Sequence, residues 1–142
     1  MIAPHRACAA VLWTCTVLLA GRVAGQLIVA RWAPRWLPPM EQWQSGLVRY
    51  PVLVGWQAVV LALMSWASAD VMRGAGFWSA PPAGMPHTSV VLGAIYFAGM
   101  MVRYVVRMRR RPDQRWLGGT IPIIFHSIVA LFLWTFGACH GG

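Results

Sequence analysis

Four long apolar runs constrain the fold of this chain more than any other feature. They cover residues 8–30, 51–72, 88–106 and 120–138. Each is close to the ~20 residues that an α-helix needs to cross a hydrocarbon core of roughly 30 Å. Only 11% of the 142 residues are charged and the mean hydropathy is +0.58, whereas soluble domains are about one quarter charged. We therefore predict a chain that spans a membrane.

Backbone chemistry selects helices over strands. In lipid every N–H and C=O must be satisfied within its own segment or by a closed barrel, and these runs are too long and too uniformly apolar for barrel strands. The longest connections, residues 31–50 and 73–87, are too short for a soluble domain. We expect an all-α polytopic membrane protein, an antiparallel four-transmembrane-helix bundle, with 1–142 as a single domain. Met40, Trp43 and Leu47 recur at helical spacing and predict a short interfacial helix at about residues 39–49 in the first loop.

The positions of the arginines predict the orientation. The first and third connections, which share one side, carry Arg31, Arg35, Arg49, Arg107, Arg109, Arg110, Arg111 and Arg115. The opposite side, with both termini, has only Arg6 and Arg73. Because positively charged loops stay on the cytoplasmic side, both termini are expected to be periplasmic or extracellular.

The basic residues also suggest a source. All 12 are arginines, and Gly, Pro and Trp are abundant. This is typical of a GC-rich bacterial genome, so we expect the bacterial inner (cytoplasmic) membrane. An alternative interpretation of residues 1–25 is a cleaved signal peptide, with Val23, Ala24 and Gly25 before the cleavage point. That alternative would send the arginines of the third connection outside, which the charge bias opposes.

The net charge of +9 raises the question of nucleic-acid binding. The charge lies at helix ends and not in an independent folded module, so we expect no nucleic-acid partner. A juxtamembrane cluster consists of Arg107, Arg109, Arg110, Arg111 and Arg115. We expect it to lie on anionic lipid headgroups, which attract such residues by about 1 kcal/mol each.

Polar residues inside the apolar runs are the most informative for function. At 1.5 Å per residue, Arg22, Gln57 and His126 share a depth of roughly 9 to 12 Å from the cytoplasmic ends of their spans. Gln26 lies one turn from Arg22 on the same helix face, and Arg103 lies nearer the boundary, where it can snorkel. A charge at the depth of Arg22 costs at least about 2.5 kcal/mol on insertion scales and normally faces a partner or water. These five residues are candidate contacts for a partner, a lipid or a quinone headgroup; the structural alternative is a snorkelling Arg22 and a hydrogen-bonded His126.

Small residues predict where helices pack, because lipid supplies no hydrophobic drive between spans and close backbone approach is needed. The second run has a stripe at Gly55, Ala58, Ala62, Ser65 and Ala69, and the first has Gly21 and Gly25. We expect both to be packing faces, within this chain or against a partner or second copy.

The non-cytoplasmic side gathers several residues of metal-ligand type. His5, His87, His140 and Asp70 are candidate ligands for a metal or, through the histidines, for haem, although no tight ligand spacing is present. Cys8 and Cys139 end neighbouring spans in an oxidising compartment and could form a disulfide. The sequence names no cofactor, and we expect none.

No pattern supports catalysis, because the chain lacks paired carboxylates, a nucleophile with an adjacent base, and phosphate-cradling glycine loops. We therefore predict a protein that is not an enzyme. The leading expectation is an accessory or assembly subunit of a membrane complex, which acts by association. The alternatives are a small oligomeric transporter or channel for an anionic or quinone-like solute, and a carrier of metal or haem on the outer face.

Overall fold

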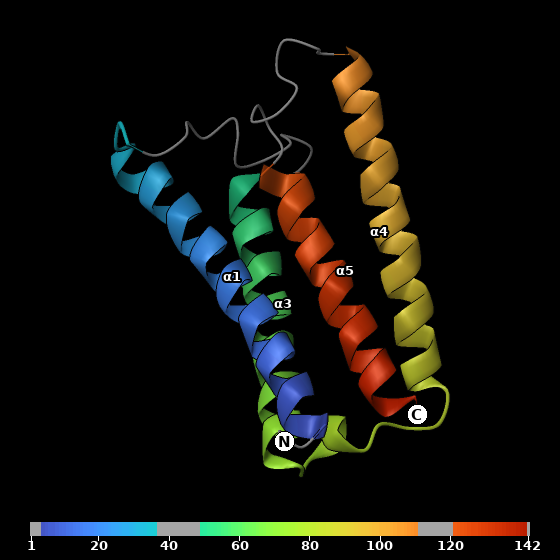
Figure 1. Ribbon diagram of the computed structural model, residues 1–142. Helices are drawn as coiled ribbons and strands as arrows, with labels where there is room; N and C mark the ends of the chain where they lie inside the picture. The colour runs from blue at the N-terminus through green and yellow to red at the C-terminus, as the bar shows by residue number, and fades with distance from the viewer. Residues whose placement is uncertain (1–3, 37–48, 111–120, 142) are drawn as a thin grey trace.

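The computed structural model describes residues 4–36, 49–110 and 121–141, which form four long α-helices and one short 3-10 helix (Figure 1). The elements are α1 (Pro4–Trp32), α3 (Tyr50–Arg73), η1 (Phe77–Ser79), α4 (Met85–Arg110) and α5 (Ile121–His140). All four α-helices are long and apolar enough to cross a membrane. The predicted all-α, four-span fold is confirmed. The interfacial helix predicted at residues 39–49 lies outside the described residues, apart from Arg49.

The ends of α3 show why the chain turns where it does. Pro51 lies in the first turn, where its missing N–H has no intrahelical partner to lose. Gly74 ends the helix in the left-handed conformation, with φ of 65°, and its N–H donates to the carbonyl of Val71 at 3.2 Å. The next element, η1, folds back beneath the helix and lies at the same end of the molecule as both chain termini (Figure 1). We call this end the terminal end and the opposite one, where α1 and α4 finish in arginines, the arginine-rich end.

The four helices pack in a chain of neighbours and not in a closed ring. Within the described residues α1 packs against both α3 and α5, and α5 packs in addition against α4. The backbone of α3 approaches neither α4 nor α5 closely. The described part of the molecule is therefore two helix pairs, α1 with α3 and α4 with α5, joined along α1 and α5. Between α3 and α5 the contact is made by side chains and not by closely approaching backbones.

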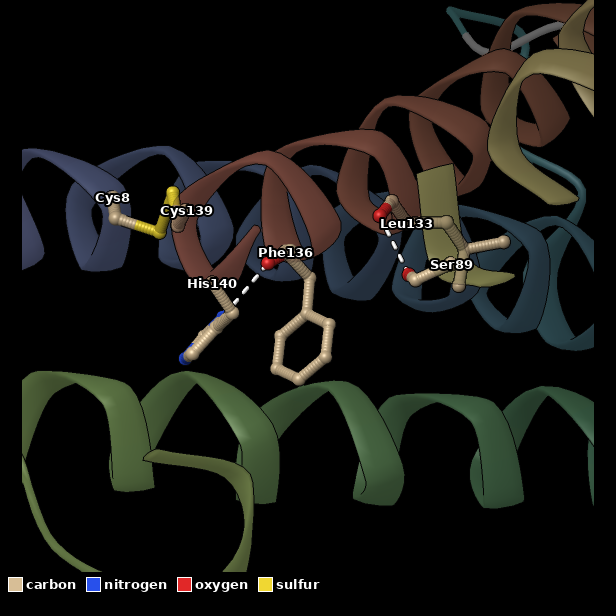
Figure 2. Close-up of a disulfide and its surroundings, with 6 residues drawn as sticks. All are labelled: Cys8, Ser89, Leu133, Phe136, Cys139 and His140. Carbon is tan, nitrogen blue, oxygen red and sulfur yellow. Dashed lines mark hydrogen bonds between the residues drawn. A yellow bond between two sulfur atoms is a disulfide. The ribbon is translucent and has the colours of Figure 1, made fainter. Parts of the chain in front are cut away.

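The main hydrophobic cluster lies toward the terminal end, where α1, α3 and α5 meet. Its buried members include Leu12 and Cys15 of α1, Met64 of α3 and Phe132 of α5. A disulfide between Cys8 and Cys139 joins the first and last helices at its edge (Figure 2). These are the two cysteines for which the sequence allowed such a bond.

Two polar contacts and two glycines complete the packing. Thr16 and Ser68 approach within 3.3 Å across the α1–α3 contact, and Ser89 of α4 donates to the Leu133 carbonyl of α5 at 2.7 Å (Figure 2). A Cβ on Gly93 would lie 2.9 Å from the backbone of α5, and a Cβ on Gly137 would collide with the backbone of α4. The α4–α5 pair therefore depends on small residues at both of these positions.

The predicted small-residue stripe of α3 is covered only in part within the described chain, where Ser65 and Ala69 are half-buried. Gly55, Ala58 and Ala62 are exposed, whereas the buried face of α3 carries Gln57 and Met64 among others. Lipid is as apolar as a protein core, so small residues show that close approach is possible but not which partner makes it. The stripe remains available to another molecule.

Candidate functional site

A small cavity, lined by four polar side chains among apolar ones, lies between the helices nearer their arginine-rich ends. Its volume is about 110 Å³, and each of the four helices contributes one polar side chain to its lining. These residues are Arg22 from α1, Gln57 from α3, Tyr96 from α4 and His126 from α5. The three residues that the sequence placed at one depth therefore line one cavity. We call this set of four residues the polar layer.

Two glutamines link α1 to α3 in this layer. Gln57 Nε2 donates to Gln26 Oε1 at 3.2 Å, and the residues are only 7% and 1% exposed. The hydrogen bond uses one polar atom of each amide and leaves Gln57 Oε1 and Gln26 Nε2 buried without a hydrogen-bond partner. A buried amide atom left in this way costs roughly 1 to 3 kcal/mol. Because Gln57 lines the cavity, a bound group could satisfy its free oxygen.

A tyrosine and a histidine pair on the opposite wall. The Tyr96 hydroxyl and His126 Nδ1 form a hydrogen bond, and the rings meet edge to face with centroids 5.6 Å apart. When the hydroxyl donates to Nδ1, the imidazole proton resides on Nε2 and is available as a donor. Sequence reasoning missed Tyr96. The signal available was its position seven residues before Arg103, which places both on one face of α4.

Arg22 lines the same cavity as this pair. Arg22 is 7% exposed, and its guanidinium carbon lies 5.9 Å from the centre of the Phe125 ring, within cation–π range. Arg22 and Arg103 are both close enough to His126 to act on it electrostatically. Arg103 does not line the cavity. Asp70 is the only carboxylate side chain in the described ranges, and it lies at the terminal end.

The candidate metal ligands are not brought together. No three His, Cys, Asp or Glu residues form a metal-binding group within the described part of the chain, which contains His5, His87, His140 and Asp70. Asp70 instead accepts hydrogen bonds from Arg73 at 2.8 Å and from the Trp78 backbone N–H at 3.3 Å. His140 Nδ1 forms a hydrogen bond with the carbonyl oxygen of Phe136 (Figure 2). The metal site therefore stays a prediction without support from the described residues, because sharing one side of the membrane does not by itself bring side chains on separate elements within reach of one ion.

The other predicted groups lie where the sequence placed them, as far as they are described. Arg107, Arg109 and Arg110 form the last turn of α4, whereas Arg111 and Arg115 lie outside the described residues. A hollow of about 630 Å³ is on the surface of α4 and α5 and is lined almost entirely by apolar side chains such as Phe97, Ile124 and Leu131. Such a surface suits lipid contact and adds no chemistry to the polar layer.

Comparison of the chain with protein-family models, curated proteins and solved structures finds no match. Function is therefore inferred from the polar layer itself.

Proposed function

We propose that this multi-pass protein of the bacterial inner membrane acts by association, and that its polar layer holds the polar headgroup of a membrane amphiphile such as a lipid or a quinone. The observation that carries the proposal is the shared cavity, to which all four helices bring one polar side chain. No catalytic step is part of the proposal. The arginine-rich loops and the apolar surface around this layer would hold the protein in the membrane.

The physical reason is the cost of polar groups in a membrane interior. Intramembrane Arg and His residues normally face a partner, a cavity or a pathway. Here Gln57 is buried on the cavity wall with one amide oxygen unsatisfied. A headgroup that offers a hydrogen-bond donor to Gln57 Oε1 would satisfy this buried oxygen.

The disulfide and the arginines support the same orientation. Cys8 and Cys139 are bonded at the terminal end, and disulfides persist in oxidising compartments outside the bacterial cytoplasm. The arginines of the opposite end favour the cytoplasm. We infer that both termini are periplasmic. Alkaline phosphatase fused after Gly142 should be active in bacterial cells, and the same enzyme fused after Arg110 should be inactive; the reverse pattern would overturn this orientation.

A protein partner or a second copy is also part of the proposal. The small residues Gly55, Ala58 and Ala62 of α3 are exposed, and most of α4 is exposed as well. Close approach of a further helix would use the α3 surface. Native mass spectrometry after purification in a mild detergent should then show a mass above one chain. Ala58→Leu should shift that mass to a single chain, while Val52→Leu, at another exposed position of α3, should not.

Native mass spectrometry of the bound ligand also tests the headgroup proposal. We expect the purified protein to retain an amphiphile, and Gln57→Leu and His126→Phe to lower its occupancy by about tenfold, because each removes one hydrogen-bonding group worth about 1.4 kcal/mol. His87→Phe, at an exposed site near the terminal end, is the matched control and should retain the ligand. Equal occupancy in all variants would refute the proposal.

A small oligomeric transporter for an anionic or quinone-like solute is the second candidate, because the cavity lies between the two helix pairs and is lined by all four helices. This function predicts flux of an anionic solute in proteoliposomes that Arg22→Ala abolishes. Retained ligand without any flux would favour the binding role.

A further inference from the structure

The surface hollow between α4 and α5 is an apolar groove that reaches the arginine-rich end of both helices. Its volume is about 630 Å³. From α4 it is lined by Phe97, Met101 and Tyr104, and from α5 by side chains between Ile123 and Trp134. Tyr104 lies near the arginine-rich end of α4, and Ile123 lies in the first turn of α5. We call this hollow the α4–α5 groove.

The length of the α4–α5 groove matches one leaflet of a membrane. Trp134 follows Ile123 by 11 positions on α5, which is roughly 16 Å at 1.5 Å per residue. This is about half of a hydrocarbon core of roughly 30 Å. At the deep end, a Cβ on Gly93 would lie 2.9 Å from the backbone of Ala130 and Trp134, so the two helices touch there. The groove therefore follows the leaflet at the arginine-rich end.

Arg107 lies beside the shallow end of the groove. It follows Tyr104 by three positions, and residues with this spacing are neighbours on a helix surface. Arg107 Nε is buried and has no hydrogen-bond partner among the described residues. A guanidinium N–H that is shielded from water needs an acceptor, and phosphate oxygens fit the planar geometry of the guanidinium group. A phosphate at this position would supply the acceptor.

The composition of this part of the chain sets the sign of the charge. Residues 103–115 contain six arginines and one acidic residue, Asp113. If Asp113 and Glu41, which lie outside the described residues, each neutralised one of these arginines, four positive charges would still remain. Anionic headgroups attract such juxtamembrane arginines. A second copy with the same orientation would bring the same arginines to this end, so charge favours an anionic lipid over a second copy as the occupant.

We propose that the α4–α5 groove binds an anionic phospholipid of the adjacent leaflet, with its phosphate at Arg107 and one acyl chain along the groove from Tyr104 to Trp134. This site is separate from the polar layer, because no residue lines both the groove and the polar cavity. Bulk lipid is as apolar as the groove, so the acyl chain adds little affinity. The headgroup contact supplies the affinity, and the groove selects the place where the lipid lies.

The headgroup is tested with phosphatidylglycerol and phosphatidylethanolamine that carry identical acyl chains. Each lipid is added to the full-length protein in detergent micelles, and binding is measured by native mass spectrometry. We expect phosphatidylglycerol to bind about tenfold more tightly, a difference of roughly 1.4 kcal/mol. Equal binding of the two lipids by the parent protein would overturn the inference.

Two arginines of the same helix provide matched variants for the phosphate contact. Arg107→Gln should reduce the preference for phosphatidylglycerol to about twofold or less, because it removes the charged group at the groove. Arg109→Gln removes the same charge at an exposed position two residues away and should keep most of the preference. A preference that survives Arg107→Gln, or one that falls equally in both variants, would show that the arginines act only as a diffuse charge.

Two neighbouring residues of α4 provide matched variants for the acyl chain. Met101→Trp should weaken phosphatidylglycerol binding by about fivefold, because the larger side chain takes up space in the groove. Val102→Trp makes a similar change at a position that is 63% exposed and does not line the groove, and it should bind the lipid like the parent. Equal binding by both variants would place the acyl chain elsewhere and overturn the site.

A final pair of measurements separates this site from the polar layer. Gln57→Leu should bind phosphatidylglycerol like the parent, since Gln57 does not line the α4–α5 groove. Loss of the lipid in Gln57→Leu would assign it to the polar layer and overturn the separate site. Phosphatidylglycerol with a photoreactive group at the methyl end of one chain should cross-link to α5 near Leu131 and Trp134. Cross-links confined to α3 would contradict the groove.

Discussion

Asp70 shows how one buried carboxylate organises the turn after α3. It is 2% exposed, accepts hydrogen bonds from Arg73 and from the Trp78 N–H, and leaves no room for a Cβ on Gly76. Its contacts join the last turn of α3 to η1. Trp78 in turn meets Trp66, Phe77 and Phe136 edge to face. The carboxylate thus positions an aromatic cluster at the terminal end.

Replacing Asp70 should therefore cost more than replacing its ion-pair partner. We expect Asp70→Ala to lower the free energy of unfolding by about 1 to 3 kcal/mol, because it leaves the Trp78 N–H without its acceptor. Arg73→Ala should cost less than about 1 kcal/mol, since the Arg73 side chain is 68% exposed and the pair is screened. Thermal denaturation in detergent measures both; an equal loss in the two variants would show that the exposed ion pair carries the effect.

Two glycines near the same turn allow the cost of backbone strain to be compared with the cost of a steric clash. Gly74 has φ of 65°, and a Cβ added there would meet no atom within 4 Å, so Gly74→Ala should cost only the left-handed strain, roughly 1 to 2 kcal/mol. Gly76 has φ of 106°, and a Cβ there would strike the Asp70 carboxylate. We expect Gly76→Ala to lower the melting temperature more than Gly74→Ala does. The opposite order would mean that the turn adjusts freely around Asp70.

The residues of the polar layer were partly predictable from the sequence. Arg22, Gln57 and His126 could be placed at one depth by counting residues from the span ends, because a helix has a fixed rise. Which side chains turn toward one another depends on helix rotation, which hydropathy does not determine. Tyr96 was missed for that reason, since a tyrosine in an apolar run also fits a lipid-facing position.

Among the elements, α4 has the smallest share of buried surface and packs only against α5 within the described residues. The contact depends on Gly93, where an added Cβ would lie 2.9 Å from the backbone of α5 at Ala130 and Trp134. Backbone atoms cannot move aside as a flexible side chain can. The α4–α5 distance is therefore sensitive to one methyl group.

We expect Gly93→Ala to destabilise the protein by about 1 to 3 kcal/mol and to loosen α4 from α5. Gly99→Ala is the control on the same helix, with no atom within 4 Å of the added Cβ, and should be neutral or slightly stabilising. Cross-linking between cysteines introduced at Ser89 and Leu133 would report the separation. Undiminished cross-linking in Gly93→Ala would show that the helices can accommodate the methyl group.

The helices themselves were predictable from sequence, and their packing partners were not. The observed helices extend the four predicted spans by a few residues at most ends, for example to Arg110 in α4 against a predicted end at residue 106. Length and apolarity fix such segments because unpaired backbone groups are costly in lipid. The stripe that includes Ala58 and Ala62 did not indicate which partner it would meet, because lipid competes equally for every apolar face.

For the whole molecule, the Cys8–Cys139 disulfide spans a sequence separation of 131 residues. Closing so long a loop restricts the unfolded chain strongly, and losing such a bond typically costs about 2 to 5 kcal/mol. We expect a reductant to lower the melting temperature of the parent protein. The double variant Cys8→Ala with Cys139→Ala should already melt at the lower temperature and should not respond to reductant. A parent protein that is insensitive to reduction would contradict this account.

The same bond gives the molecule a property that no single helix has. With its first and last spans bonded to each other, the chain between them is a covalent ring, so one protease cut in any connection linearises the ring and releases nothing. The two resulting pieces would still migrate as one species, and they would part only when a thiol is added.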